Sequence, residues 1–428
     1  MIWLGVATIS QREPSLLIML PFAILVISIA IAPIILQHRW ERYYHKVCLG
    51  LAAFVGGYYL LARHDAKRVL HAGFEYVSFI AVVGSFFVVS GGTHLRAPSH
   101  VVPAANTIFL LLGALLSNVV GTIAASVLLI RPWIEMNKAR FSGFHLAFFI
   151  FVVSNVGGAL LPVGPPLFLG YLKHIPFFWP LVRCWPHWCI AIAALLSIFY
   201  IVDRRQFSKA TSVPVVSGGT EKWHCFGKRN LIFMSIMLGA LIAFPPIWRE
   251  VAIGGCAIMS YYWTPARIHE ANAFTFAPIK EVAWLFLGIF ATMIPVLDYV
   301  ELHARDLGVQ TDAQFFWATG LLSALLDNAP AYLTFLAGAL GLHGLDMNSA
   351  NHMAEFVTRH DHSLIAVSLG ATFFGALTYI GNGPNLLVKA IAQDLKVPTP
   401  SFFGFIFKFA GPVLLPIFAL LSVLFFRK

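Results

Sequence analysis

The chain has 428 residues, of which 59% are apolar and only 11% are charged. Soluble domains carry about 25% charged residues, so this composition excludes an ordinary water-soluble protein. One bilayer crossing needs about 20 apolar residues, and we therefore expect a polytopic membrane protein with no large aqueous domain. The formal net charge of +10 comes from basic residues between apolar runs. They form no basic stripe, so we expect a lipid bilayer and no nucleic acid as partner.

The five cysteines are scattered and form no CxxC pair: Cys48, Cys184, Cys189, Cys225 and Cys256. This pattern indicates neither a disulfide framework nor a zinc site, and we expect packing residues. The apolar run at 15–36 is too long for a signal-peptide core and has no small-residue cleavage site after it. We therefore expect it to be the first retained span.

Taken in chain order, the apolar runs are of two kinds. Uninterrupted runs predict simple transmembrane helices at 15–36, 47–62, 72–91, 185–202, 230–244, 247–263, 281–298 and 402–426. Other runs contain Gly, Pro, Asn or Ser in the middle and are too long for one straight crossing: 104–131, 145–172, 314–341 and 363–392.

A polar, basic segment at 204–229 reads as a linker between two halves. We therefore expect N-terminal scaffold helices at 1–71, a first repeat at 72–203 and a second repeat at 230–428. If 104–131 and 314–341 are hairpins that return to their own side, about ten full spans remain. The positive-inside rule then places the linker in the cytoplasm, and we expect a multi-pass protein of the bacterial inner membrane.

The two halves carry similar motifs in the same order. LLSNVVGTIAAS (115–126) precedes SNVGGALLPVGPP (154–166), and LLSALLDNAPAYLTF (321–335) precedes GALTYIGNGPN (375–385). On the topology above, the first hairpin starts from the cytoplasm and the second from outside. The fold class we predict is an all-α membrane protein of inverted repeats, with two re-entrant hairpins and two broken transmembrane helices.

The interruptions have a chemical meaning. Backbone groups freed at a break cannot stay unpaired in lipid, so a broken helix persists where protein or a water-filled cavity meets it. There, free carbonyls and Ser, Asn and Asp oxygens can bind Na⁺, and half-helix N-termini can face an anion. Ser and Asn are also common N-caps, and Gly and Pro common packing or kinking residues. Recurrence of the pattern in both halves favours a secondary transporter.

Asp327 is the acidic residue that sits deepest in an apolar run. Intramembrane carboxylates are costly and usually functional, although this one can also cap the half-helix that follows. A buried carboxylate that holds either H⁺ or Na⁺ supports exchange between them. Glu75, Glu281 and Asp298 lie near the ends of apolar runs and are weaker candidates. A His-rich segment around His360 could bind metal, but we expect a solvated loop.

At these motifs the chain resembles the ion transporter superfamily, in particular NhaD-type sodium:proton antiporters and related proteins labelled as citrate transporters. The matching segments are 154–166, 285–299, 323–335 and 375–392. The resemblance implies a homodimer that works by alternating access, with a transport domain moving against a scaffold. It assigns Asp327 and Asn328 as the proton site, and as cation or substrate ligands Ser117, Asn118, Thr122, Ser154, Asn155, Thr378, Asn382 and Asn385.

One departure leaves two functions open. Many antiporters of this type carry Asp-Asn in the first hairpin, where this chain has Ser117-Asn118, closer to the Ser-Asn-Thr pattern of sodium-coupled carboxylate carriers. We favour Na⁺/H⁺ antiport, because no Lys or Arg lies within the motif cores to balance a polyanion. The alternative is Na⁺- or H⁺-coupled transport of citrate, a dicarboxylate or another small oxyanion. We expect no cofactor beyond the transported ions and, without HExxH or similar motifs, no enzyme.

Overall fold

The computed structural model describes residues 14–35, 37–96, 102–209, 224–303, 306 and 308–427. Within these residues, helices long and apolar enough to cross a membrane are Arg42–Ala62, Ala66–Gly91, Pro103–Val120, Trp179–Ser208, Ala277–Val300 and Phe402–Phe425. Further apolar helices are shorter. The expectation of an all-α polytopic membrane protein is confirmed, with two short strands as the described exception.

The first half begins with α1 (Leu16–Ile35), α2 (Gln37–Gly57), the π-helical turn η1 (Tyr58–Ala62) and α3 (Ala66–Gly91). It continues with β1 (His94–Arg96), α4 (Pro103–Val120), α5 (Thr122–Met136), α6 (Gly143–Val152), η2 (Val156–Gly158), α7 (Leu167–Leu172) and α8 (Trp179–Lys209). The predicted linker therefore starts inside a helix, because α8 extends to Lys209. Residues 210–223 of the linker lie outside the described part of the chain.

The second half begins with β2 (His224–Phe226), α9 (Arg229–Ala243), α10 (Trp248–Trp263), α11 (Ala266–Ala271) and α12 (Ala277–Leu302). It continues with α13 (Asp312–Leu325), α14 (Asn328–Leu342), α15 (Ala350–Arg359), α16 (Asp361–Phe374) and η4 (Gly375–Leu377). It ends with α17 (Gly383–Asp394), α18 (Phe402–Phe405), η5 (Ile406–Ala410) and α19 (Gly411–Phe425).

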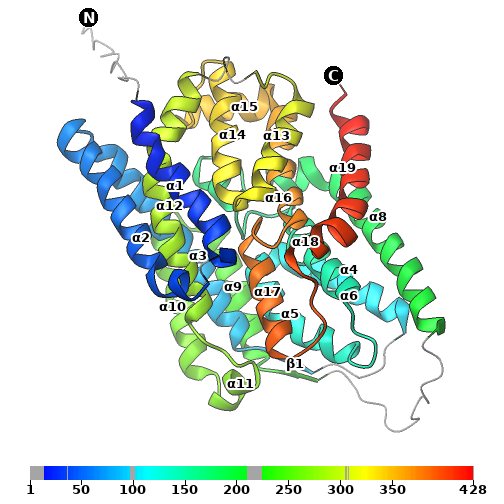
Figure 1. Cartoon of the computed structure of the whole chain (residues 1–428). Helices are drawn as coiled ribbons and strands as arrows, with labels where there is room; N and C mark the ends of the chain where they lie inside the picture. Colours follow the sequence, from blue (N-terminus) through cyan, green and yellow to red (C-terminus); the bar gives the residue numbers. More distant parts are fainter. Residues whose placement is uncertain are drawn as a thin grey trace, which may run out of the picture.

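Two helical groups lie side by side (Figure 1). Helices α1, α2, α3 and α12 pack together, with α9 and α10 against α3. The stacked rings of Phe79 and Phe286, 4.5 Å apart, join α3 to α12. In the other group, the α13–α14 pair lies in the upper half of Figure 1 and the α4–α5 pair in the lower half.

Aromatic packing holds α13, α16 and α19 together. The Phe374 ring stacks on Phe418 at 4.5 Å and meets the edge of Phe316 at 5.2 Å. Such ring pairs contribute about 0.5–1.5 kcal/mol each beyond the area they bury. The cysteines form no disulfide in the described chain: Cys48 and Cys184 are buried, while Cys189 is exposed.

In each of the long interrupted apolar runs, one helix ends and another begins part-way along the run. Gly121 ends α4 with φ +84°, a conformation that a residue with a Cβ rarely adopts. In the second half, Leu326 and Asp327 leave the helical region between α13 and α14. The α6–α7 run opens after Val152, and the α16–α17 run opens after η4. These breaks place non-helical backbone in the interior of the molecule.

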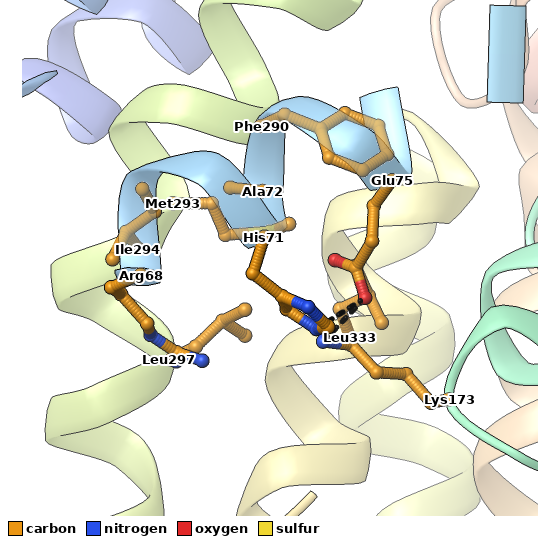
Figure 2. Close-up of a pocket in the computed structure, with 10 residues that line it drawn as sticks. All are labelled: Arg68, His71, Ala72, Glu75, Lys173, Phe290, Met293, Ile294, Leu297 and Leu333. Atoms are coloured by element: carbon orange, nitrogen blue, oxygen red, sulfur yellow. Dashed lines mark ion pairs between the residues drawn. The ribbon is translucent and has the colours of Figure 1, made fainter. Parts of the chain in front are cut away.

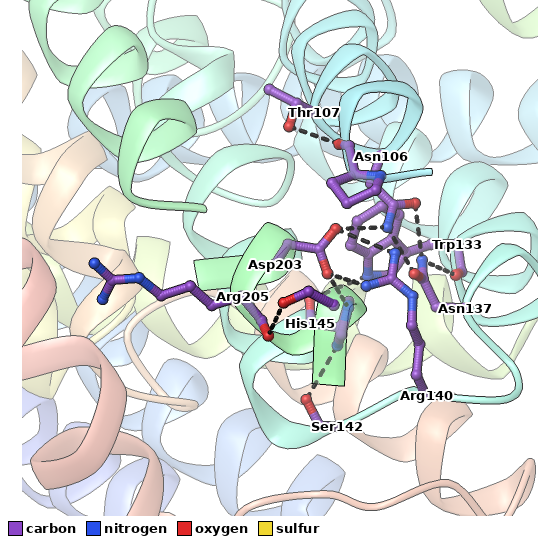
Figure 3. A network of polar contacts seen from close by, with 11 residues as sticks. Asn106, Thr107, Trp133, Asn137, Arg140, Ser142, His145, Asp203 and Arg205 are labelled. Carbon is purple, nitrogen blue, oxygen red and sulfur yellow. Dashed lines mark hydrogen bonds and ion pairs between the residues drawn. The ribbon is translucent and has the colours of Figure 1, made fainter. Parts of the chain in front are cut away.

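A buried polar network fixes the base of the α4–α5 pair (Figure 3). Asp203 of α8, which is fully buried, accepts from Asn106 of α4 at 3.1 Å and from Arg140 at 3.2 Å. His145 of α6 lies 3.1 Å from the same carboxylate. Four segments thus share one negative charge, which balances the buried guanidinium.

We predict that Asp203→Asn lowers the free energy of unfolding by about 3–5 kcal/mol, because Arg140 loses the charge that compensates its burial. Thermal unfolding of the purified protein in detergent measures the change. Glu355→Gln is the matched control, since Glu355 forms an exposed ion pair with Arg359 and should cost a few tenths of a kcal/mol. Equal unfolding temperatures for the two variants would contradict the role given to Asp203.

Candidate functional site

In the first hairpin, polar side chains tie α4 to the broken helix beside it. Ser117 donates to the Val153 carbonyl at 2.7 Å, and Asn118 accepts from the Leu160 amide at 2.7 Å. Ser117 and Asn118 lie inside α4, one turn before Gly121, and Thr122 begins α5. Asn118 also donates to Ala114 O at 3.0 Å. The side chains of this hairpin therefore bond to a backbone carbonyl and a backbone amide in the break between α6 and α7.

The α6–α7 break presents Ser154 and Asn155, both fully buried. Ser154 exchanges a hydrogen bond of 2.8 Å with Ser126 of α5. Asn155 donates to Ile150 O at 2.9 Å and to Asn385 Oδ1 at 2.8 Å. The second of these bonds joins the two halves of the chain.

The α16–α17 break contributes amide side chains from the second half of the chain. Asn382 donates to Ser154 O at 2.9 Å and to Asn155 Oδ1 at 3.0 Å. Asn385 donates to Gly375 O and Thr378 O, at 2.8 and 2.9 Å. Thr378 itself donates to Ala324 O at 2.6 Å, which binds the break to α13. The freed carbonyls are thus satisfied by side chains from the same break.

The backbone of Gly375 lies against the side chains of Asn328, in the second hairpin, and of Asn155. A Cβ built on Gly375 would lie 2.2 Å from Asn328 Oδ1 and 2.9 Å from Asn155 Oδ1. Two amide oxygens from different halves therefore face one glycine. We call Asn155, Asn328, Asn382 and Asn385 the asparagine cluster. All four are at most 1% exposed.

Two polar atoms of the site residues that the sequence predicted are left without a partner. Thr122 Oγ1 and Asn382 Oδ1 are buried, and neither has a hydrogen-bond partner among the residues that the structure describes. A buried polar atom without a partner costs free energy, so such atoms in a native protein call for an explanation. A transported ion or its water is the kind of partner that would satisfy them.

Asp327 lies next to the asparagine cluster and faces another way. It caps α14 by accepting from Ala329 N at 3.2 Å, and the Gly383 amide at the start of α17 lies nearby. The carboxylate therefore sits at two helix N-termini, whose partial positive charge stabilises an anion. Its cavity is apolar, lined by α1 and α12 residues such as Ile29 and Ile289.

The sequence motifs did not single out Ser323. Ser323 donates to Ala371 O at 2.7 Å, as Ser117 does to Val153 O. Each serine lies four residues before the position that breaks its hairpin, Gly121 or Asp327. The shared Leu-Leu-Ser at 115–117 and 321–323 is the signal that could have pointed to Ser323.

The remaining candidates lie outside the asparagine cluster. Asp298 is paired with Arg68 and accepts from Tyr59 at 3.0 Å, and Glu281 is exposed on α12. Lys389 lies 4.5 Å above the Tyr379 ring. In the part of the chain that the structure describes, no group of His, Cys, Asp and Glu side chains could hold a metal ion. This holds for the His-rich segment too.

We predict that Gly375→Ala lowers substrate affinity at least tenfold, because the new methyl group would displace the Asn155 and Asn328 oxygens. Titration of the purified protein with labelled citrate or with ²²Na⁺ measures this. Gly50→Ala is the control, since nothing lies within 4 Å of a Cβ at Gly50. Unchanged affinity in a folded Gly375→Ala protein would remove the asparagine cluster from the binding site.

Comparison with known proteins supplies the family. A protein-family model described as "Putative citrate transport" matches residues 11–426. A search of curated proteins found no match to this chain. Because the family match covers nearly the whole chain, the protein belongs to this citrate transport family.

Proposed function

We propose that the protein is a secondary transporter that carries citrate or a related small carboxylate together with H⁺ or Na⁺. The observation that carries the proposal is the position of Asp327, whose carboxylate lies at the N-termini of α14 and α17 beside the asparagine cluster. The family supports a carboxylate substrate. This reverses the preference for Na⁺/H⁺ antiport that the sequence motifs alone suggested.

Charge explains why such a site would couple the substrate to a cation. The ionised Asp327 occupies the partial positive charge of two helix ends and repels an approaching polyanion. Protonation, or a bound Na⁺, neutralises the carboxylate. The two helix ends are then free to attract a substrate carboxylate, as helix N-termini bind anions elsewhere. Substrate thus binds well only with its cation.

The asparagine cluster would hold the ions. Asn155 Oδ1 and Asn328 Oδ1 face the same glycine, and Asn382 Oδ1 and Thr122 Oγ1 lack partners. Neutral oxygens of this kind suit a hard cation. In this structure Ser117, Thr378 and Asn385 donate to backbone carbonyls, and Ser154 bonds to the Ser126 hydroxyl, so we assign all four to holding the breaks in place.

Movement would follow from inverted repeats. In Figure 1 the α13–α14 pair lies in the upper half and the α4–α5 pair in the lower half, and Ser117 and Ser323 each donate to a carbonyl of a broken helix, which supports two repeats of opposite orientation. We propose re-entrant hairpins, about ten spans, a homodimer and alternating access, with α1, α2, α3 and α12 as scaffold. The repeats are 72–203 and 230–428, as the sequence suggested.

Na⁺/H⁺ antiport is the second candidate, and one observation favours it. Among the described residues no salt bridge to Asp327 is found, and its cavity contains no other charged side chain. Such a carboxylate can exchange H⁺ for Na⁺ directly. Antiport of the NhaD type would use Asp327 without any carboxylate substrate.

Proteoliposomes distinguish the candidates. We expect an imposed inward H⁺ or Na⁺ gradient to drive accumulation of labelled citrate. Asp327→Asn should reduce this accumulation at least tenfold while citrate exchange without a gradient persists, because a permanently neutral site binds substrate but no longer couples it. Asp312→Asn in the same hairpin, where Asp312 accepts from Ser363, should behave like wild type.

Loss of an internal pH gradient on addition of NaCl, with no citrate uptake, would favour antiport instead. Absence of both fluxes in folded, reconstituted protein would contradict the proposed function altogether.

A further inference from the structure

A cavity lined by charged side chains, separate from the Asp327 cavity, lies where α3, α7, α12 and α14 meet (Figure 2). Glu75 of α3 is only 7% exposed, and its Oε1 lies 2.7 Å from Lys173 Nζ and 3.2 Å from His71 Nε2. Lys173, at the end of α7, is 4% exposed and also donates to Asn348 at 3.0 Å. The cavity has a volume of about 20 Å³, enough for one water molecule.

The other charges around Glu75 are already balanced. On its own helix, Arg68 also lines the cavity and is paired with Asp298 of α12. The remaining lining from α12 and α14 is apolar, including Met293 and Leu333. Glu75 is therefore a buried acid with one fixed cation, Lys173, and one titratable neighbour, His71. The side chain of His71 is 46% exposed, so it joins the buried pair to the surface.

This cavity and the Asp327 cavity are neighbours along one seam. Ile289 of α12 lines the Asp327 cavity, and Met293, four residues later, lines the Glu75 cavity. On α14, Pro330 lines the first and Leu333, three residues later, lines the second. Residues three and four apart share a helix face, and one turn advances about 5.4 Å. One turn of two packed helices thus separates the two acids' cavities.

We propose that His71 and Glu75 form a proton relay that serves Asp327 along the α12–α14 seam. The inference rests on the proposed function, since it needs Asp327 to take up a proton during transport. A proton bound at His71 Nε2 passes to Glu75 Oε1, leaving neutral imidazole and a carboxylic acid. A water in the Glu75 cavity takes up the proton, and water that enters the α12–α14 seam passes it to the Asp327 carboxylate, while Glu75 returns to its ionised form beside Lys173.

Lys173 has a positioning role. It holds the Glu75 carboxylate at the edge of the cavity and restores the ion pair after each transfer. Because Lys173 lies at the end of α7 while Glu75 lies on α3, the pair also links the broken helix of the first half to the helices packed on α12. Proton transfer to Glu75 would weaken that link at the moment when Asp327 is loaded.

Proton uptake and substrate exchange, measured separately in proteoliposomes, test the relay. We expect Glu75→Gln to slow substrate-driven proton uptake at least tenfold, while exchange of labelled for unlabelled citrate stays within twofold of wild type. Asp312→Asn is the matched control: Asp312 is a partly buried carboxylate that accepts from Ser363 and lines neither cavity, so both rates should be unchanged.

Two further variants keep the test decisive. His71→Asn should slow proton uptake, and added imidazole buffer should restore it, which a structural role for His71 does not predict. If Glu75→Gln fails to fold because Lys173 is left buried and charged, Glu75→Gln/Lys173→Met removes both charges and should show the same selective loss.

Wild-type rates and pH dependence of proton uptake in folded Glu75→Gln would overturn the relay, and so would equal losses of proton uptake and citrate exchange. If the wild-type protein transports citrate with Na⁺ and no protons, the relay is wrong while transport stands. If it transports no citrate at all, the proposed function fails first.

Discussion

The structure depends on one constraint: helices that break inside an apolar protein must find partners for the backbone groups they release. Here the partners are side chains of a neighbouring segment or of the break itself. Ser117 and Ser323 each cover a carbonyl of a neighbouring broken helix, and Asn385 covers two carbonyls of its own break. The same amides also bond across the halves, so one set of residues closes the breaks and forms the candidate site. Any change that improves ion binding must leave these carbonyls paired.

Local signals in the sequence sufficed to find the breaks. Gly121, Asp327 with Pro330, and the Gly-Asn-Gly-Pro segment at 381–384 disrupt apolar runs by their own conformational preferences. The contacts between the two halves leave no such signal in the sequence. The bond from Asn382 to Asn155, and the position of Gly375 against two amide oxygens, depend on how the halves dock. Ser323 escaped notice because a serine inside an apolar helix is unremarkable until its acceptor is known.

Three carboxylates in the molecule, Asp203, Asp327 and Glu75, differ in the groups that stabilise their charge. The Asp203 network is closed, with every charge compensated at the base of the first hairpin. Asp327 is held by backbone amides, which leaves its charge open to neutralisation by a transported cation. Glu75 stands between these cases, since Lys173 stabilises its charge while His71 offers it a proton. Burial alone does not separate them; the chemical nature of the partners does.

Coupled transport in the proposed mechanism depends on neutralisation of Asp327 when substrate binds. Calorimetric titration of the purified protein with citrate, repeated in buffers of different ionisation enthalpy, counts the protons taken up per substrate in the absence of Na⁺. We expect citrate binding to take up about one proton beyond any change in citrate's own ionisation, and Asp327→Asn to bind citrate without this uptake. Equal proton uptake by wild type and Asp327→Asn would contradict the coupling role of this carboxylate.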